Sequence, residues 1–524
     1  MDDTQLISDI EAYVERVWPA VVEDLAALVA IPSVAESDKA EEGAPYGPEA
    51  KRALTCALDM AKRLGLEPHD MDGYIGYADL PGKSDTQIAT IAHVDVVPAG
   101  VGWTQDPFTM TEREGYLLGR GVIDDKGPAV LTAYMARYFI ERGETLPYSL
   151  RLIFGSDEEV GMTDVDHYLS VHESPAFLFT PDASFPAGVG EKGHCGGTFT
   201  SPALEGGLLV ALEGGTVTNA IPGLAQAWVL ADAATLPQVE GIEVAACTAA
   251  DLPEGAQAPA AGTALTCITA HGKGGHASLP EGTRNAIGML VNYLLRADLV
   301  EGAERDCLEL LSQLHASTDG SSVGIDATDD LFDPLTCIGG TIHKKAGRIE
   351  QTIDIRYPKS TTTAHMVPIL EELAAKHGCV FTLTSDAVPF YVAPDHPAIQ
   401  ALIGAYNEFT GKQAEPVTMG GGTYARKFAC AASFGPEEPG EEFPSFVGSM
   451  HGPDEGVSVE LLQRSLKIYI YALAKLMELE FYLGSDSVWG RRIRARLLCA
   501  WYPAPLKFGF GLKKRIRLRF NLTG

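Results

Sequence analysis

The stretch Gln87-Ile-Ala-Thr-Ile-Ala-His-Val-Asp-Val-Val97 is an apolar run that ends in a histidine and an aspartate. Short apolar runs that are rich in β-branched residues and bounded by polar residues are typical of buried strands. Two more such runs cover residues 148–154 and 176–180, and a helical pattern covers 127–142. This order predicts βαβ units and an α/β domain with a central, mostly parallel sheet flanked by helices.

The amino-acid composition of the chain changes twice beyond these strands. From about residue 190 the sequence becomes rich in Gly, Ala and Thr, and the acidic and aliphatic pattern returns at Pro394. We therefore expect a first domain made of residues 1–190 and 386–482, with an α+β domain, 191–385, inserted into it. Further expected elements are helices at 7–31, 285–299, 363–377 and 457–483 and a strand at 348–357.

Composition and charge restrict the class of protein. The 524 residues include 70 Asp+Glu against 40 Lys+Arg, and the net charge of -30 argues against nucleic acid as the principal partner. No apolar run reaches the roughly 18 to 20 residues that a spanning helix needs, and the start, Met-Asp-Asp-Thr, is unlike a positively charged signal peptide. We expect a cytoplasmic protein without a transmembrane segment.

The nine cysteines occur singly and without any CxxC pair, which favours reduced thiols over disulfides or a thiolate zinc site. Metal ligands, if present, are therefore expected to be His, Asp and Glu. The last residues form a different kind of segment, 483–524, which is basic and contains aromatic residues. This tail is either an appendage without a role in the chemistry or a contact for anionic lipid, RNA or the acidic body of the protein itself.

Acidic and histidine residues follow the predicted strands. His93 and Asp95 are two residues apart, so in a strand they would project to the same side, near the carboxyl end where ligands of α/β sheets collect. Taken alone, His93 could be a core histidine and Asp95 a loop cap. Asp124 and Asp125 precede the helix predicted at 127–142, where one acid could be the N-cap, but two acids exceed what a cap requires.

The next two strands end in carboxylates as well. Asp157, Glu158 and Glu159 follow one another, and they would repel unless a cation or proton intervened, although a solvated acidic loop is the alternative. Asp182 follows the third strand, and His451 precedes the last helix. Together these residues predict a hydrolytic site for two metal ions, in which one carboxylate bridges the ions and another works as general base and acid.

The motifs at these positions resemble the M20 family of dinuclear metallopeptidases and, within it, the PepV-like and carnosinase-like dipeptidases. The resemblance covers residues 5–482. It rests on five motifs in order, which are His93-Val-Asp95, Gly121-Val-Ile-Asp-Asp-Lys-Gly127, Asp157-Glu-Glu-Val-Gly161, Thr180-Pro-Asp182, and His451 with Asp454-Glu455.

The resemblance implies a role for each residue of the predicted site. His93 and Asp182 would hold one ion, Glu159 and His451 the other, and Asp124 would bridge the two. Glu158 would be the catalytic acid and base, Asp95 would orient His93, and the bond between Asp124 and Asp125 would be cis. The two divalent ions are expected to be zinc, although manganese or cobalt would also suit these ligands.

The inserted domain resembles the lid of the family. His276, in Gly274-Gly-His-Ala-Ser278, would stabilise the oxyanion of the reaction. Asn219 and Arg356 would bind the carboxylate of the substrate. The glycine-rich segment that contains Gly421, Thr423 and Tyr424 would lie near the substrate. The length of the insertion implies a double-sized lid that takes the place of a partner subunit, and hence a monomer.

The sequence therefore predicts a metal-dependent dipeptidase that hydrolyses α-aminoacyl or β-alanyl dipeptides. One alternative is another activity of the same family, such as an N-acyl amino acid deacylase or a carboxypeptidase, which would share every metal ligand. A second alternative is a metal- or peptide-binding protein that has lost catalysis. Glu158 argues against the second, because a protein that only holds metal has no use for a proton shuttle.

Overall fold

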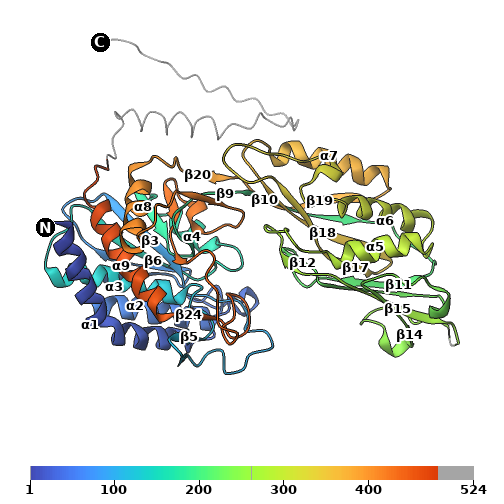
Figure 1. Ribbon diagram of the computed structural model, residues 1–524, viewed down its shortest axis with the longest axis horizontal. Helices are drawn as coiled ribbons and strands as arrows, with labels where there is room; N and C mark the ends of the chain where they lie inside the picture. The colour runs from blue at the N-terminus through green and yellow to red at the C-terminus, as the bar shows by residue number, and fades with distance from the viewer. Residues whose placement is uncertain (1, 261, 482–524) are drawn as a thin grey trace, which may run out of the picture. The chain divides into compact units, whose positions relative to one another are not determined.

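The apolar runs of the sequence form the centre of a nine-stranded sheet (Figure 1). In spatial order its strands are β1 (Glu67–Met71), β2 (Ile75–Leu80), β6 (Ser149–Gly155), β3 (Gln87–His93), β7 (Phe177–Thr180), β22 (Ala431–Ser433), β9 (Gly188–Glu191) and β20 (Phe390–Tyr391), with β21 (Val417–Met419) beside β9. The central strands β6, β3, β7 and β22 are parallel, and antiparallel pairs flank them. The computed structural model describes residues 2–260 and 262–481.

Helices cover both faces of this sheet. They are α1 (Asp3–Val29), α2 (Pro48–Leu64), α3 (Lys126–Arg142), α4 (Thr163–Leu169), α8 (Pro397–Thr410) and α9 (Val459–Leu476), with the short helices η1 (Ser37–Lys39) and η5 (Tyr424–Lys427). On one face Ile91 of β3 packs with Val165 of α4 and Tyr424 of η5. On the other face α3 contacts β3 and β6, and α1, α2 and α9 pack around α3.

Two small sheets lie beside the main one. The first contains β24 (Gly456–Ser458), β5 (Tyr116–Leu118) and β4 (Thr111–Arg113), and the second contains β23 (Pro436–Glu437) and β8 (Ala183–Ser184). Through these pairs, the segment that follows β22 and the segment that precedes α9 return to the carboxyl ends of the central strands.

A second large sheet has eight antiparallel strands. In spatial order they are β14 (Ile242–Cys247), β15 (Leu265–His271), β13 (Leu224–Val229), β11 (Leu209–Gly214), β17 (Thr336–Lys345), β18 (Arg348–Tyr357), β10 (Gly193–Thr200) and β19 (Val380–Ala387). The other elements of this part are α5 (Ala286–Arg296), α6 (Gly302–Leu314), α7 (Thr363–Lys376), η2 (Ala233–Thr235), η3 (Ala249–Asp251), η4 (Ser321–Val323) and the ribbon of β12 (Ala220–Ile221) and β16 (Gly275–His276).

The second sheet is inserted into the first part, as the sequence predicts. All its strands lie between Gly193 and Ala387, after which β20 rejoins the nine-stranded sheet. One cluster of buried side chains from α5, α6, α7 and the sheet forms its core. The fold class, an α/β domain with an inserted α+β lid, is confirmed, while the domain boundaries at 190/191 and 385/386 stay predictions.

The expected elements exist, with shifted ends. The strand at 348–357 is β18 itself, and α1, α3, α5, α7, β6 and β7 lie within a few residues of their expected ranges. The strand predicted to reach Val97 was wrong at its end, because it stops at His93. Beyond that residue the backbone leaves the ladder, and the Val96 N–H donates to the Ser33 carbonyl at 3.1 Å. The last helix also ends early, at Leu476.

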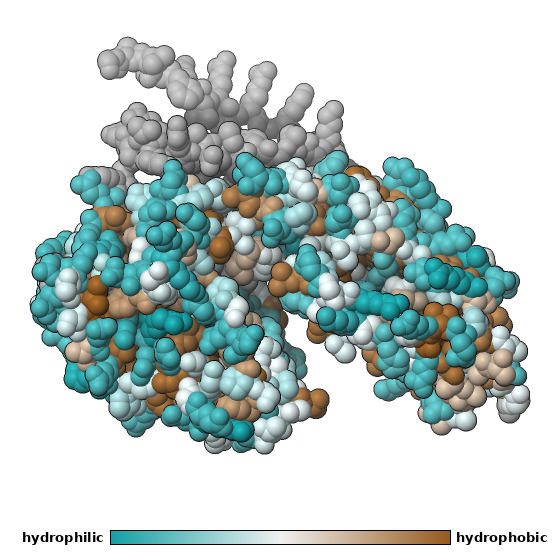
Figure 2. Space-filling view, in the orientation of Figure 1, coloured by the Kyte–Doolittle hydropathy of each residue, from teal (hydrophilic) through white to brown (hydrophobic). Residues whose placement is uncertain are grey.

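Hydrophilic residues dominate the visible face of both sheets, with hydrophobic residues in small groups among them (Figure 2). Within residues 2–260 and 262–481, none of the helices combines the length and the apolar character that crossing a bilayer requires. The basic segment predicted at 483–524 lies outside the described residues.

Candidate metal centre

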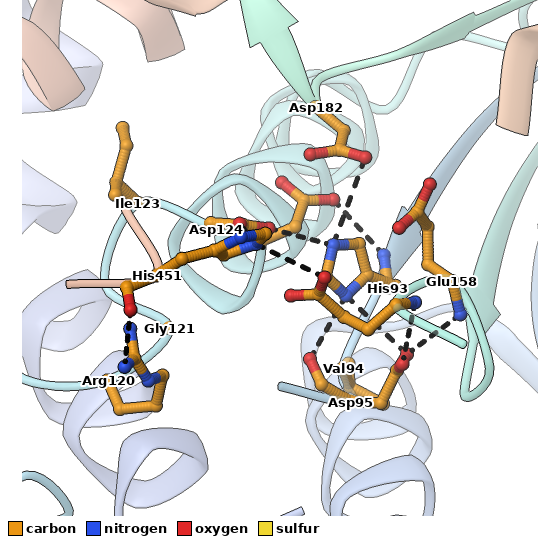
Figure 3. A network of polar contacts seen from close by, with 12 residues as sticks. His93, Val94, Asp95, Arg120, Gly121, Ile123, Asp124, Glu158, Asp182 and His451 are labelled. Atoms are coloured by element: carbon orange, nitrogen blue, oxygen red, sulfur yellow. Dashed lines mark hydrogen bonds and ion pairs between the residues drawn. The ribbon is translucent and has the colours of Figure 1, made fainter. Parts of the chain in front are cut away.

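The predicted ligands meet at the carboxyl ends of the central parallel strands (Figure 3). His93 is the last residue of β3, Asp182 follows β7, and residues 157–159 follow β6. Asp124 lies in the loop before α3, and His451 lies in the loop before β24. Because parallel strands end at the same edge of a sheet, the fold brings His93, Asp182 and residues 157–159 together, and the two loops bring Asp124 and His451 to them.

Asp124 lies between the two histidines. Its Oδ1 is 2.9 Å from His93 Nε2, and its Oδ2 is 2.8 Å from His451 Nε2. Each histidine has a further carboxylate, since Asp182 Oδ2 lies 3.8 Å from His93 Nε2 and Glu159 Oε2 lies 3.2 Å from His451 Nε2. The side chains therefore form two groups, each with one histidine and one terminal carboxylate, and Asp124 is common to both.

Donor atoms of His93 with Asp124 and Glu159, and of His93 with Asp125 and Asp182, lie within 4.8 Å of one another, as metal ligands do. Glu159 Oε1 and Asp125 Oδ1 are buried and have no hydrogen-bond partner within the described chain. A buried carboxylate oxygen without a partner is costly unless a cation or proton meets it. The arrangement therefore fits divalent cations, and it is the imidazole and carboxylate ligand set that zinc, manganese and cobalt accept.

The charges of the site are balanced between histidines and carboxylates. Although burial alone would lower the pKa of His93, its hydrogen bond to Asp124 and the charge of Asp182 raise it well above its ordinary value. Hydrogen bonds to Asp124 and Glu159 raise the pKa of His451 to about 11. Burial raises the pKa of Asp182 to about 7. Bound cations would place further positive charge beside these carboxylates.

Asp95 connects the segment that follows β3 to the loop that follows β6. The His93 Nδ1 atom lies 3.0 Å from the Asp95 backbone carbonyl and 3.5 Å from its Oδ1. The backbone N–H groups of Glu158 and Glu159 donate to the two Asp95 oxygens at 3.4 and 3.2 Å. Asp95 lies beyond the strand rather than on it, yet it still meets His93, and the Val94 N–H between them donates to the Gly155 carbonyl of β6 at 3.0 Å. A carboxylate so placed can fix the orientation of the imidazole ring.

Glu158 carries its carboxylate on the same side of the His93 ring as Asp182 (Figure 3). Burial and the negative charge of Asp182 raise the pKa of Glu158 well above its ordinary value. A carboxyl group with raised proton affinity in such a place suits a general acid and base. The peptide bond between Asp124 and Asp125 is cis, as the resemblance implies.

Sequence reasoning missed a buried ion pair behind the site. Arg120 and Glu455 are 1% and 0% exposed and their charged atoms lie 2.5 Å apart. Glu455 Oε1 accepts from the backbone N–H groups of Gly121 and Ile123, and Arg120 donates to the His451 carbonyl at 3.3 Å. The pair therefore joins the loop of Asp124 to the loop of His451. The available signal was that Glu455 stands inside a ligand motif, and Arg120 directly before another, without either being a ligand.

The lid residues His276, Asn219 and Arg356 lie near one another. His276 on β16 pairs with Ala220 on β12, and the backbone carbonyl of Asn219 accepts from Ala277 at 2.9 Å. Burial and the nearby charge of Arg356 lower the pKa of His276. Arg356 donates to the glycine-rich segment, from Nη1 to the Gly420 carbonyl at 3.4 Å. Asn219 itself is exposed.

The residues of the glycine-rich segment differ among themselves. Gly421 is partly exposed, whereas Thr423 and Tyr424 are buried. The Thr423 hydroxyl donates to Glu191 Oε1 at 2.6 Å, and the Tyr424 hydroxyl donates to Asp164. Both hydroxyls are thus committed to carboxylates of the protein. The Tyr424 ring also lies edge-on to the His93 ring, with their centroids 6.5 Å apart. A contact with substrate stays a prediction for Gly421, Thr423 and Tyr424.

Comparison with known proteins agrees with this architecture. Residues 89–475 match the model of peptidase family M20/M25/M40. The chain is 31% identical over 474 residues to YtjP of Bacillus subtilis (strain 168), provisionally named a dipeptidase, with 89% of this chain and 99% of that protein covered. It is 30% identical over 472 residues to the Beta-Ala-Xaa dipeptidase of Lactobacillus delbrueckii subsp. lactis, with 88% and 97% covered.

Solved structures with the same fold include the di-peptidase Dug1p of Saccharomyces cerevisiae, with a TM-score of 0.55 and 13% identity, and human carnosine dipeptidase 1, with 0.52 and 15%. Each comparison covers 90% of this chain and 99% of the other chain.

Proposed function

The chain belongs to peptidase family M20/M25/M40, and on that basis we propose that it is a metal-dependent dipeptidase acting on α-aminoacyl or β-alanyl dipeptides. The observation that carries the proposal is Asp124, whose two oxygens face two separate histidines, each with its own carboxylate. This is the arrangement of a carboxylate that bridges two cations. The dipeptidase names of the relatives from Bacillus and Lactobacillus support the substrate class.

His93 and Asp182 would hold one ion, and His451 and Glu159 the other. Two such ions would polarise the scissile carbonyl and lower the pKa of the attacking water. Glu158 would take the proton of that water and deliver it to the leaving amine, as its raised pKa allows. Asp95 would hold the His93 ring in place through its contacts at Nδ1.

The lid would supply the groups that meet the rest of the substrate. The Ser278 N–H donates to His276 Nδ1 at 3.2 Å, which leaves the ring proton on Nε2, free to donate to an oxyanion. Asp354 holds Arg356 through two hydrogen bonds of 2.7 and 2.9 Å. A guanidinium fixed in this way can receive the carboxylate of a dipeptide and so limit the length of the substrate.

We also propose zinc as the metal, a cytoplasmic location and a monomeric state. The ligand set supports zinc, with manganese or cobalt as the next candidates. The eight cysteines within the described residues are all free thiols, which supports a reducing compartment. The eight-stranded lid, which is large for a covering element, supports the monomer.

The test is hydrolysis of Ala-Ala, β-Ala-His, N-acetyl-alanine and Ala-Ala-Ala by metal-stripped protein, to which zinc or manganese is restored. We expect cleavage of the two dipeptides alone. Glu158→Gln should bind the same amount of metal and lose activity by about 100-fold or more. Cleavage of N-acetyl-alanine in preference to the dipeptides would assign the chain to the deacylases instead. Two bound ions without any cleavage would favour a binding protein.

A further inference from the structure

A cavity of about 270 Å³ lies next to the predicted metal ligands. Ile123, Ser184 and Met450 line it, and each is one or two residues from a predicted ligand in the chain. Phe443 and other apolar side chains form part of its wall. A cavity bounded by neighbours of three ligands is placed to receive a part of the molecule on which the metals act.

Glu437 on β23 is a carboxylate of this cavity, and its strand lies beside the segment that carries Asp182. β23 pairs in parallel with β8, which begins one residue after Asp182. The Ser184 hydroxyl donates to Glu437 Oε2 at 3.1 Å. Burial and, more weakly, the negative charge of Asp124 raise the pKa of Glu437, so this side chain is desolvated and within electrostatic range of the metal centre.

The neighbouring Glu438, in contrast, is paired with cations of the protein. Its carboxylate accepts from the Tyr406 hydroxyl at 2.6 Å and from Arg464 at 3.3 Å, and it also contacts Lys412. Within the described part of the chain, the Glu437 carboxylate accepts from the Ser184 hydroxyl and pairs with no Lys or Arg, although the charge of His451 acts on it. Among the described residues that line the cavity, none is a Lys, Arg or His. The cavity therefore presents a partly buried negative charge that no cationic side chain of its lining pairs, with His451 as a weaker, more distant positive influence.

We propose that Glu437 receives the free ammonium group of the substrate's amino-terminal residue in this cavity, and thereby selects unblocked dipeptides over N-acylated compounds. The inference rests on the proposed function, which supplies an ammonium group on that side of the scissile bond. The ammonium has three donors and a positive charge, and both suit a desolvated carboxylate with free lone pairs. An acylated nitrogen has one N–H and no charge, so it would leave Glu437 buried without a counterion.

The test compares Glu437→Gln with Glu438→Gln in the full-length, zinc-loaded enzyme. For Glu437→Gln we expect the KM for Ala-Ala to rise about 10- to 100-fold, as the loss of a hydrogen bond between charged groups implies, while kcat stays within about threefold. The inhibition constant of N-acetyl-Ala-Ala, which lacks the ammonium, should change less than about threefold. Glu438→Gln should leave the ratio of these two constants unchanged even if it lowers thermal stability.

Metal content, measured by mass spectrometry, distinguishes recognition from support of the ligands. Loss of zinc from Glu437→Gln would overturn the inference, and so would an unchanged KM for Ala-Ala in a variant that keeps both ions. If Glu437→Gln does not fold, Ser184→Ala removes the hydroxyl that orients the carboxylate, and an unchanged KM for Ala-Ala in that variant would also overturn the inference. Failure of the proposed function is a separate result, in which the wild-type enzyme cleaves none of the free-amine dipeptides.

Discussion

Replacement of Arg120 by Met should destabilise the protein and weaken metal binding together. The change keeps an apolar stem of similar length and removes the cation that faces Glu455 at 2.5 Å in a site where both side chains are at most 1% exposed. Loss of one member of a buried ion pair typically costs about 3 to 5 kcal/mol of unfolding free energy. Because burial already raises the pKa of Glu455 to about 7 beside Arg120, the variant can protonate this carboxyl near neutral pH, so we expect the lower value, about 3 kcal/mol.

The pH dependence of that loss follows from the same argument. Without Arg120 the folded-state pKa of Glu455 rises further above its ordinary value of 4.5. A carboxyl with a raised folded pKa contributes stability at low pH, and that contribution disappears as the pH rises through the folded pKa. The difference between wild type and Arg120→Met should therefore be larger at pH 8.5 than at pH 6.

Urea unfolding followed by tryptophan fluorescence measures the loss of unfolding free energy and its dependence on pH. Trp103 lies 5.2 Å from the Arg120 guanidinium and reports on this region. The double variant Arg120→Met/Glu455→Gln is the control, and it should recover at least half of the lost free energy because it removes the unpaired charge. Zinc affinity should fall about 10- to 100-fold in Arg120→Met, because the loops of Asp124 and His451 lose their connection. A loss below about 1 kcal/mol that is the same at both pH values would refute the reasoning.

Three further predictions concern side chains around the site. Asp95→Asn should lower zinc affinity about 10- to 100-fold, measured by competition with a chelator, because Asp95 orients His93 and accepts from two loop N–H groups. Asp354→Asn should raise the KM for dipeptides about 10-fold with little change in kcat, because Arg356 loses the carboxylate that holds its guanidinium in place. An unchanged KM would show that Arg356 does not bind the substrate. Burial raises the pKa of Glu191 from 4.5 to about 7, so its stabilising contribution is present below about pH 4.5 and is lost as the pH rises to about 7, by up to about 3 kcal/mol. Urea unfolding of Glu191→Gln at several pH values should show a flatter profile than wild type over this range, and parallel profiles would contradict the assignment.

The ligand positions could be predicted because each one is marked locally. An apolar run followed by an acid or a histidine identifies a strand end, and the parallel order of β6, β3 and β7 then places those ends at one edge. The structure places Asp182 Oδ2 at 3.8 Å from His93 Nε2 and the Glu158 and Glu159 N–H groups on Asp95, as that reasoning requires. Asp124 and His451 lie in loops, and the motifs rather than a strand end marked them. The roles of these residues in holding metal stay predictions.

The parts that sequence reasoning missed depend on partners that are distant in the chain. Arg120 and Glu455 are 335 residues apart, so neither residue marks the other. The contact of Tyr424 with Asp164, which lies 260 residues away in the chain, was missed for the same reason, and the predicted place of Tyr424 near the substrate stays a prediction. The antiparallel strands β1 and β2 were missed because β1 has no buried residues and shows no apolar alternation.

The carboxylates that are not predicted ligands explain how so many acids can share this edge of the sheet. Asp95 accepts from the backbone of Glu158 and Glu159, and Glu455 accepts from the backbone of Gly121 and Ile123. Each of these acids thus compensates its own burial with N–H groups of the loops that carry the ligands, and in doing so it fixes those loops. The loops that carry the predicted ligands are therefore held in place by hydrogen bonds within the protein, in addition to any bond that the ligands make to a metal.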